Sequence, residues 1–457
     1  MLGPLDETLK RAARRYRLPA DAGAFPPAPG ASPSTVLAVV IERAREAVAR
    51  GEAPEPTLKG MFVAALAQLI REAMRKESGD PVFQAMAYRH RAAEVREYAS
   101  LSAHAERDRR AIHAAVNAVA HPAKQQRMPP GPQREALALL HASAASEAWP
   151  DFYAVLQRLS VAQSTSPLSF DHTVRQLLDS AELARLLRLV TLASDARVRE
   201  YQSLWDRHGP RPQSAAALAH GVASKQRGAE VEALAAEALE RLAQRLNEAE
   251  GALASYRVVN SMRVPAALPA SHERAKTEWD AVLLRRANTA KENAWDVCLL
   301  VEAKASVDAA STDFPRLLRG LELLAHADAN TVYPFRTQQG TVSLHGASLR
   351  ALRTDEARLA GTVLYCCAAP AEATPRLLSA AGRMQLLSAE ASLVFANALA
   401  AEHHADSSDL EPVWQQLLES PKWRALLKQY PTLCRVRELM VHADDLLSAV
   451  TTTTGHC

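Results

Sequence analysis

Three charged residues in the C-terminal half have the types and the spacing of a metal-dependent hydrolytic site. Asp280 lies in the run EWDAVLLRR (278–286), and Glu302 and Lys304 lie in the run WDVCLLVEAKAS (295–306). Two neighbouring carboxylates repel each other, and a divalent cation resolves that conflict. Mg²⁺, or Mn²⁺ in its place, suits oxygen ligands and takes only one or two protein carboxylates. We therefore predict that Asp280 and Glu302 bind the metal and that Lys304 either orients the bound water or stabilises negative charge on a phosphate.

The two runs read as adjacent antiparallel strands joined by a polar turn. Lys291 lies midway between Asp280 and Glu302, so a symmetric hairpin places these two carboxylates opposite each other. Opposed residues have Cβ atoms roughly 4.5–5.5 Å apart, which is close enough to share one cation. Side chains alternate along a strand, so Glu302 and Lys304 should share a face. Removing one carboxylate should leave the fold intact and could raise its melting temperature, because the like charges repel.

The elements around this hairpin predict an α/β domain inside a helical protein. A helix is expected over 214–253, strands over 256–265, 278–286 and 295–306, and then a helix over 314–327. Two further strands are expected, at 341–346 and 361–368. Helices over 375–401, 410–429 and 433–449 complete the chain.

The N-terminal part reads as helices that are interrupted by proline. Helical patterns cover about 5–17, 34–50, 57–77, 81–120 and 133–207, and residues 1–210 should be almost wholly helical. Proline-rich connectors at 128–132 and 208–212 mark boundaries. We predict four regions, in chain order: a helical N-terminal domain (1–127), a helical middle region (128–212), the α/β core (213–400) and C-terminal helices (401–457).

Composition limits the classes of protein that fit. Hydrophobic residues make up 48% of the 457 residues, which is enough for several packed cores. The formal net charge is only +3, so nucleic-acid binding would have to use local basic patches. The chain has five cysteines, no C-x-x-C pair, no apolar signal segment and no long apolar run, so a cytoplasmic location and no membrane contact are expected. Cys366 and Cys367 should be small core residues, and His403-His404 with Asp406 should be a polar loop.

The pattern Asp280 … Glu302-Ala303-Lys304 resembles the PD-(D/E)XK nuclease superfamily, whose members have the restriction endonuclease-like fold. The expected order of elements, αβββαβ, matches the core order of that family. The segment Gly228-Ala229-Glu230-Val231-Glu232 resembles the first core helix of Mrr-type and RecB-type members, and this similarity assigns Glu232 to the active site. The resemblance covers roughly residues 220–400.

The resemblance implies a Mg²⁺-dependent phosphodiesterase, endonuclease or exonuclease, that acts on DNA in restriction, repair or defence. The helical half would then bind the target, a partner or another copy of the chain, as a homo-oligomer. Trp279 occupies the position of the family's proline. Arg316 and Arg319 occupy the helix where RecB-type members carry Gln-x-x-x-Tyr. These two arginines, with the helix start near Phe314-Pro315, would contact a phosphate of the substrate. A solvated helix face explains them equally well.

Two alternatives stay open from the sequence. Glu302 and Lys304 could form a surface ion pair on an exposed strand, which would stabilise little. That reading does not explain why Glu302 follows the apolar run 297–301, where an unpaired carboxylate is unfavourable. The second alternative is a helical interaction or scaffold protein with a nuclease-like fold that does not cut, which the near-neutral charge and the 5% of aromatic residues favour.

Overall fold

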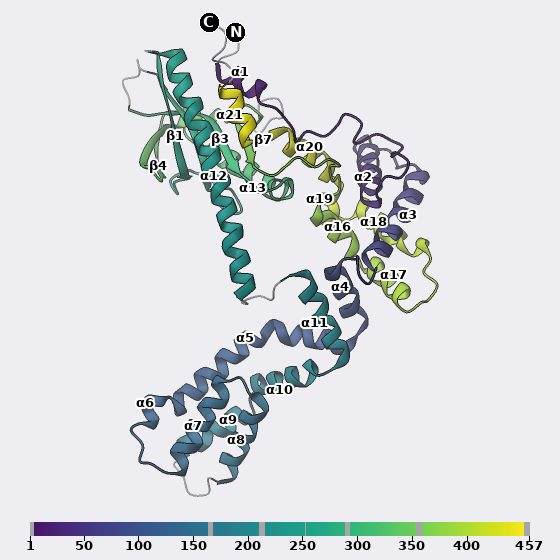
Figure 1. The fold of residues 1–457 in the computed structure, drawn as a ribbon, viewed down its shortest axis with the longest axis vertical. Helices are drawn as coiled ribbons and strands as arrows, with labels where there is room; N and C mark the ends of the chain where they lie inside the picture. Colours follow the sequence, from purple (N-terminus) through teal and green to yellow (C-terminus); the bar gives the residue numbers. More distant parts are fainter. Residues whose placement is uncertain are drawn as a thin grey trace. The chain divides into compact units, whose positions relative to one another are not determined.

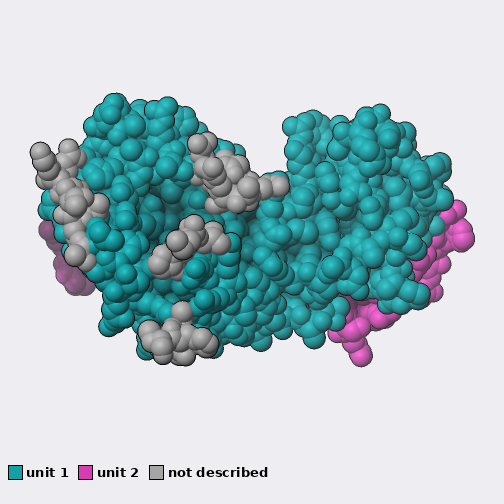
Figure 2. Space-filling view, turned by 90° about the horizontal axis from the view of Figure 1, so that it is seen from above, with its two compact units in different colours: residues 1–69, 212–387, 407–457 teal, residues 70–211, 388–406 magenta. Residues whose placement is uncertain are grey.

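The computed structural model describes residues 4–162, 168–209, 215–251, 253–287, 293–352 and 359–451 (Figure 1). The chain forms two compact units that interleave in sequence (Figure 2). Unit 1 comprises residues 1–69, 212–387 and 407–457, and unit 2 comprises residues 70–211 and 388–406. This division differs from the four expected regions, because residues 1–69 join the unit that contains the sheet and residues 388–406 join the other unit.

All regular secondary structure in the described residues of unit 2 is helical. Its helices are α4 (Pro81–Arg91), α5 (Ala93–Ala120), α6 (Pro122–Gln125), α7 (Pro132–Ala145), α8 (Trp149–Ala162), α9 (Leu168–Leu178), α10 (Ala181–Ala193), α11 (Ala196–His208) and α17 (Glu390–Ala400). The Asp80 carboxylate accepts hydrogen bonds from the backbone N–H groups of Val82 and Phe83 and so caps α4. The expected continuous helix over 81–120 is wrong, since Ala92 is extended (φ −101°, ψ 119°). The chain turns there because α4 packs on α11 and α17, whereas α5 packs on α10 and α7.

The helices of unit 1 lie on both sides of the sheet segment in sequence. They are α1 (Pro4–Arg11), α2 (Pro33–Ala49), α3 (Pro56–Ala73, which continues into unit 2), α12 (Ala215–Glu250), α13 (Val307–Ala325), α14 (Gly346–Arg350), α16 (Ala380–Leu387), α18 (Glu411–Glu419), α19 (Arg424–Leu427), α20 (Gln429–Leu439) and α21 (Ala443–Thr451). Two 3₁₀ turns, Ser407–Leu410 and Pro421–Trp423, flank α18. The first helix is shorter than the 5–17 pattern indicated.

One mixed sheet of seven strands organises unit 1. The strands are β1 (Ala254–Arg263), β2 (Glu278–Ala287), β3 (Asp296–Ala303), β4 (Val332–Thr337), β5 (Gly340–His345), β6 (Val363–Cys367) and β7 (Met440–His442). Their order is β5-β4-β1-β2-β3-β6-β7. The pairs β3–β6 and β6–β7 are parallel, and the other neighbours are antiparallel. In the described part of the chain no strand precedes β1, as predicted.

Two of these strands were not expected. The segment of β4 contains Pro334, which argues against a strand in the middle of a sheet. The sheet accommodates this proline because β4 pairs with β1 at a single position, between Arg336 and Arg263, so few backbone hydrogen bonds join these two strands. The expected helix over 433–449 is wrong, because β7 divides it into α20 and α21. The three residues of β7 are fully buried beside β6.

The two faces of the sheet are covered by different helices. On one face α12 and α21 pack against side chains such as Leu283, Val301 and Leu364. On the other face α13 and α20 pack against Leu300 and Tyr365 and their neighbours. Cys366 and Cys367 are both fully buried, as predicted for small core residues. The segment 402–406 is a loop, as predicted for the histidine pair.

Candidate active site

The hairpin of β2 and β3 has the register that its symmetry predicted. Ala281 pairs with Val301 and Val282 pairs with Leu300, so Asp280 and Glu302 come next along the same ladder. The register shifts only between Leu283 and Leu284, further toward the turn, and that shift does not reach the carboxylates. The turn residues 288–292 lie outside the described part of the chain.

Glu302 is fully buried at the end of β3. Its Oε2 accepts a hydrogen bond from Lys304 Nζ at 3.1 Å and forms a second ion pair with Lys276 Nζ. Its Oε1 is buried and has no hydrogen-bond partner. Burial, together with repulsion from Asp280, raises the pKa of Glu302 to about 7, although the two lysines oppose the shift. The carboxylate is therefore incompletely satisfied.

Asp280 joins the ends of the two strands. Its Oδ2 accepts a hydrogen bond from the backbone N–H of Ala303 at 2.9 Å. The negative charge of Asp280 also raises the pKa of both Glu302 and Lys304. Glu302 and Lys304 are in direct contact, as the alternation of side chains along the strand predicted.

Lys304 follows β3 directly and is anchored by its backbone, which donates to the carbonyl of Cys366 at 2.8 Å. Its Nζ lies 3.6 Å from Asp313 Oδ2, in α13, as well as against Glu302. Burial lowers the pKa of the Lys304 ammonium, but Glu302, Asp313 and Asp280 outweigh it and hold this pKa above its usual value. Lys304 therefore stays protonated at neutral pH.

Glu232, on α12, lies close enough to the cluster to be affected by its charges. The residue is exposed, yet its pKa is raised, first by partial burial of the carboxyl and then by repulsion from Asp280. Lys304 and Lys276 act in the opposite direction. The expected glycine of this motif, Gly228, has open space around it, because an added Cβ would meet nothing within 4 Å.

The residue that sequence reasoning missed is Lys276, two positions before β2. Its side chain is only 7% exposed, and its ammonium group pairs with the buried Glu302. The close approach of α13 at Gly320 makes room for it, because a Cβ at that glycine would lie 2.8 Å from Lys276 Cβ. A lysine in the charged run KTEWD was the available signal, but nothing local showed that it would be buried.

Tyr365 was also missed. It pairs with Glu302 across the parallel ladder of β3 and β6, and its hydroxyl donates to Asp313 Oδ2 at 3.4 Å. Burial, followed by the carboxylates of Asp313 and Glu302, raises the pKa of the phenol. Tyr365 therefore stays neutral, and its hydroxyl donates a hydrogen bond to the acidic cluster at Asp313.

Arg316 and Arg319 contact the chain itself. Their Nε groups donate to the backbone carbonyls of Ala275 (3.4 Å) and Arg274 (2.9 Å), so they hold the segment before β2 against α13. The expected helix start near Phe314-Pro315 is wrong. The helix α13 begins at Val307, where Ser306 caps it by accepting from the backbone N–H of Ala309. Proline at position 315 misled the expectation, because proline favours a first turn but here lies inside the helix.

Asp280 and Glu302 could hold a divalent cation. The buried, unpartnered Oε1 of Glu302 is a ready oxygen ligand, and Asp280 has one oxygen that the Ala303 N–H does not use. Among the described residues no group of three or more His, Cys, Asp or Glu side chains is arranged around a common metal position. Mg²⁺ requires only one or two carboxylates and keeps several waters, so this donor set fits it.

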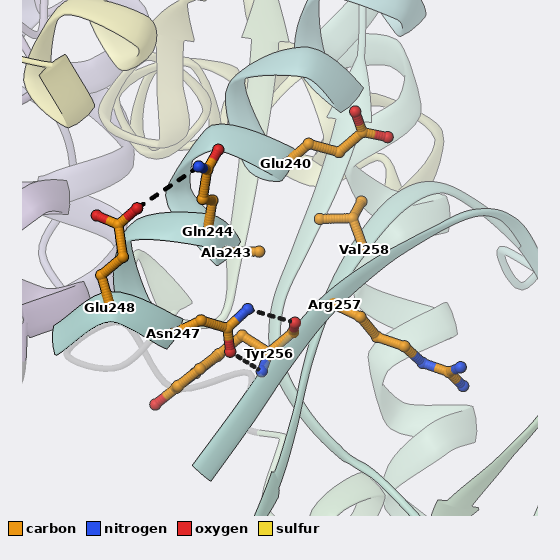
Figure 3. A pocket seen from close by; sticks show the side chains of 8 residues that line it. All are labelled: Glu240, Ala243, Gln244, Asn247, Glu248, Tyr256, Arg257 and Val258. Carbon is orange, nitrogen blue, oxygen red and sulfur yellow. Dashed lines mark hydrogen bonds between the residues drawn. The ribbon is translucent and has the colours of Figure 1, made fainter. Parts of the chain in front are cut away.

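A surface hollow of about 480 Å³ lies elsewhere on unit 1, between α12 and β1 (Figure 3). In this hollow the side-chain amide of Asn247 accepts a hydrogen bond from the N–H of Tyr256 (2.6 Å) and donates one to the carbonyl of the same residue (3.0 Å). The amide thus takes the place of a neighbouring strand at the start of β1. This hollow shares no residue with the acidic cluster, and its polar groups act in the connection from α12 to β1.

No protein-family model, curated protein or solved structure matches this chain. Among the described residues, no helix has both the length and the apolar character needed to cross a bilayer. The residues of the cluster and their contacts are therefore the basis for assigning a function.

Proposed function

We propose that this protein is a metal-dependent phosphodiesterase that cuts DNA and uses Mg²⁺ or Mn²⁺. The observation that carries the proposal is the placement of Asp280, Glu302 and Lys304 at one end of the β2–β3 hairpin, with a buried carboxylate oxygen left without a partner. Glu232 would complete this group, because the charges of Asp280 and Lys304 act on its pKa. The choice of DNA rests on the resemblance to the PD-(D/E)XK nucleases.

The arrangement of elements also supports the proposal. The order α12, β1, β2, β3, α13, β6 agrees with the αβββαβ core that the resemblance implies. The hairpin of β4 and β5 is then an insertion between α13 and β6, placed at the edge of the sheet. In this view the restriction endonuclease-like core occupies the centre of unit 1.

Each residue would have a distinct role. Asp280 and Glu302 would hold the cation, which when bound polarises a phosphate and lowers the pKa of its water. The Lys304 ammonium is fixed by Glu302 and Asp313 and can stabilise negative charge that develops on a phosphate oxygen. The Glu232 carboxylate, whose pKa is raised, can accept a proton from the attacking water.

Cleavage of plasmid and single-stranded DNA in Mg²⁺, Mn²⁺ or EDTA tests the proposal. The wild-type chain should cut with either metal and not in EDTA. Asp280→Asn and Glu302→Gln should each reduce the rate by roughly 100-fold or more, because each removes a charge that holds the cation. Asp296→Asn is the matched control, because Asp296 lies at the other end of β3 and contacts His345. It should cut at the wild-type rate.

A protein that folds but neither binds Mg²⁺ in calorimetry nor cuts DNA would contradict the proposal. The interaction or scaffold protein would then be the better account of the fold. The pairing of Glu302 with two lysines favours that alternative, since two ammonium groups already neutralise the carboxylate.

A further inference from the structure

Unit 2 contains a cavity of about 760 Å³ that takes no part in the proposed reaction. Its walls come from the end of α3, one side of each of α4 and α11, and the end of α17. Small-molecule sites in proteins have volumes of roughly 300–1,000 Å³, so this cavity has the size to hold a ligand.

The lining of the cavity is strongly basic. Five cationic side chains face it, and only two acidic ones, Glu200 and Glu402. The cationic residues are Arg71, Arg75, Lys76, Arg91 and Arg207. Among the described residues none of these five side chains forms an ion pair with a carboxylate, and Glu200 accepts a hydrogen bond from the hydroxyl of Tyr88 at 2.7 Å.

The partial negative charges of nearby helix ends do not cancel this positive charge. The C-termini of α3, α4, α11 and α17 lie at the cavity, and each carries a partial charge of roughly −0.5. Together these ends offset about two thirds of the net positive charge that the side chains supply. The cavity therefore keeps an excess of positive charge that an anion would neutralise.

Several of the cations are held in place. Gln84 is buried, and its Nε2 donates to the backbone carbonyls of Ala73 (3.1 Å) and Arg75 (2.6 Å). Its Oε1 accepts from Arg207, which also donates to the carbonyl of Lys76 at 2.8 Å. The guanidinium of Arg91 lies 4.4 Å from the centre of the Tyr88 ring. Fixed cations lose less freedom when they bind a ligand, which increases affinity.

We propose that this cavity binds a phosphate-bearing ligand of nucleotide size. The arginine side chains would bind the phosphates, because a guanidinium matches phosphate oxygens with two parallel hydrogen bonds. The apolar part of the lining, which includes Met74, Leu204 and Leu399, would contact the remainder of the ligand. The phosphate group can belong to a free nucleotide or to the end of a nucleic-acid strand.

Titration calorimetry of the full chain tests the proposal, with EDTA present so that the acidic cluster carries no metal. The probes are ATP, pyrophosphate, adenosine and a 5′-phosphorylated hexanucleotide. ATP and pyrophosphate should bind and adenosine should not. Arg91→Gln should raise the Kd for ATP about tenfold, as expected for the loss of one charged contact. Arg89→Gln is the matched control, because Arg89 is exposed on the same turn of α4 but does not line the cavity.

The double variant Arg71→Gln/Arg75→Gln tests the cavity independently, in case Arg91→Gln weakens binding by disturbing the fold. Both arginines are exposed and neither bonds Gln84 through its side chain, so the fold should persist while ATP binding is lost. Tighter binding of the hexanucleotide than of ATP would assign the phosphate to a nucleic-acid end, and the reverse would assign it to a nucleotide. No binding of ATP, pyrophosphate or the hexanucleotide, binding of adenosine as tight as that of ATP, or equal Kd values for the Arg89 and Arg91 variants, would overturn the proposal.

Discussion

Glu302 pairs with the ammonium groups of two lysines, and these pairs change the expected effect of its removal on stability. The sequence suggested that deleting a carboxylate relieves repulsion and leaves stability intact or higher. In the structure Lys276 is buried and its ammonium depends on Glu302 for a counter-charge. Removing one member of a buried ion pair leaves the other charge unpaired, which is strongly destabilising.

We therefore expect Glu302→Ala to lower the free energy of unfolding at pH 8, where Glu302 is ionised. The loss should be less than the roughly 3–5 kcal/mol usual for breaking a buried pair, because the raised pKa of Glu302 means that the lysines offset its burial only in part. Adding Lys276→Met to that variant should restore much of the loss, because the unpaired ammonium is then absent. Urea denaturation of the wild type, both single variants and the double variant measures the coupling between the two residues. Additive effects of the two substitutions would show that Lys276 and Glu302 do not interact.

The raised pKa of Glu302 predicts a pH dependence of stability in the metal-free protein. This pKa is about 7 in the folded protein, against 4.5 for an ordinary glutamate. The folded state binds the proton more tightly, so the stabilisation is present below pH 4.5 and is lost as the pH rises to about 7. The loss amounts to about 3 kcal/mol, since one unit of pKa corresponds to about 1.4 kcal/mol.

Glu302→Gln isolates this effect, because every other titrating group is common to both proteins. The difference in unfolding free energy, wild type minus variant, should fall between pH 4.5 and pH 7.5 when measured in EDTA. A difference that is constant over this range would mean that Glu302 keeps an ordinary pKa.

At the scale of elements, the packing of α13 on the segment before β2 determines where Lys276 lies. Gly320 permits the contact, because any larger residue would meet the Lys276 backbone and Cβ at 2.8–3.2 Å. By contrast Gly228, on α12, faces open space. A side chain is therefore excluded at Gly320 by close packing, whereas there is room for one at Gly228.

Gly320→Ala should destabilise the protein by about 1–3 kcal/mol, because α13 has to move away from the backbone of Lys276. It should also lower any cleavage rate, since Asp313 on the same helix positions Lys304. Gly228→Ala is the matched substitution and should stabilise by about 0.5–1 kcal/mol, the usual gain for alanine in a helix. Denaturation curves of both variants provide the comparison, and equal effects would argue against close packing at Gly320.

At the scale of the whole molecule, each unit contains hydrophobic cores of its own. Two cores of unit 1 lie on the two faces of the sheet, and two cores of unit 2 lie among α4 to α11. Chains with more than one core commonly unfold in more than one step. The two ligand sites proposed above belong to different units.

Calorimetric heating should therefore show at least two transitions, and each ligand should raise one of them. ATP in EDTA should raise only the transition of unit 2, and Mg²⁺ only that of unit 1, because a ligand stabilises the unit that binds it. Glu302→Gln should abolish the effect of Mg²⁺ and leave the effect of ATP unchanged. A single transition that both ligands raise would show that the units unfold together.

The sequence by itself determined the local parts of this protein. The helical pattern that begins at residue 81 predicted the start of α4, where Asp80 is the cap, because capping depends only on neighbouring residues. The polar turn between two apolar runs predicted the hairpin, and its symmetry predicted that Asp280 and Glu302 continue one ladder. The alternation of side chains predicted that Lys304 lies beside Glu302. Each of these follows from bonding within a few residues or across one hairpin.

Only the tertiary structure decided which distant groups meet. Lys276 is buried because α13 comes close at Gly320, forty-four residues away in sequence, and no local pattern marks that approach. The strand β7 forms because the edge of β6 accepts its backbone, although the segment alone continues a helical pattern. Arg316 and Arg319 bond the carbonyls of residues 274–275 for the same reason. Burial and pairing between distant segments depend on the whole chain, since tertiary contacts override local preference.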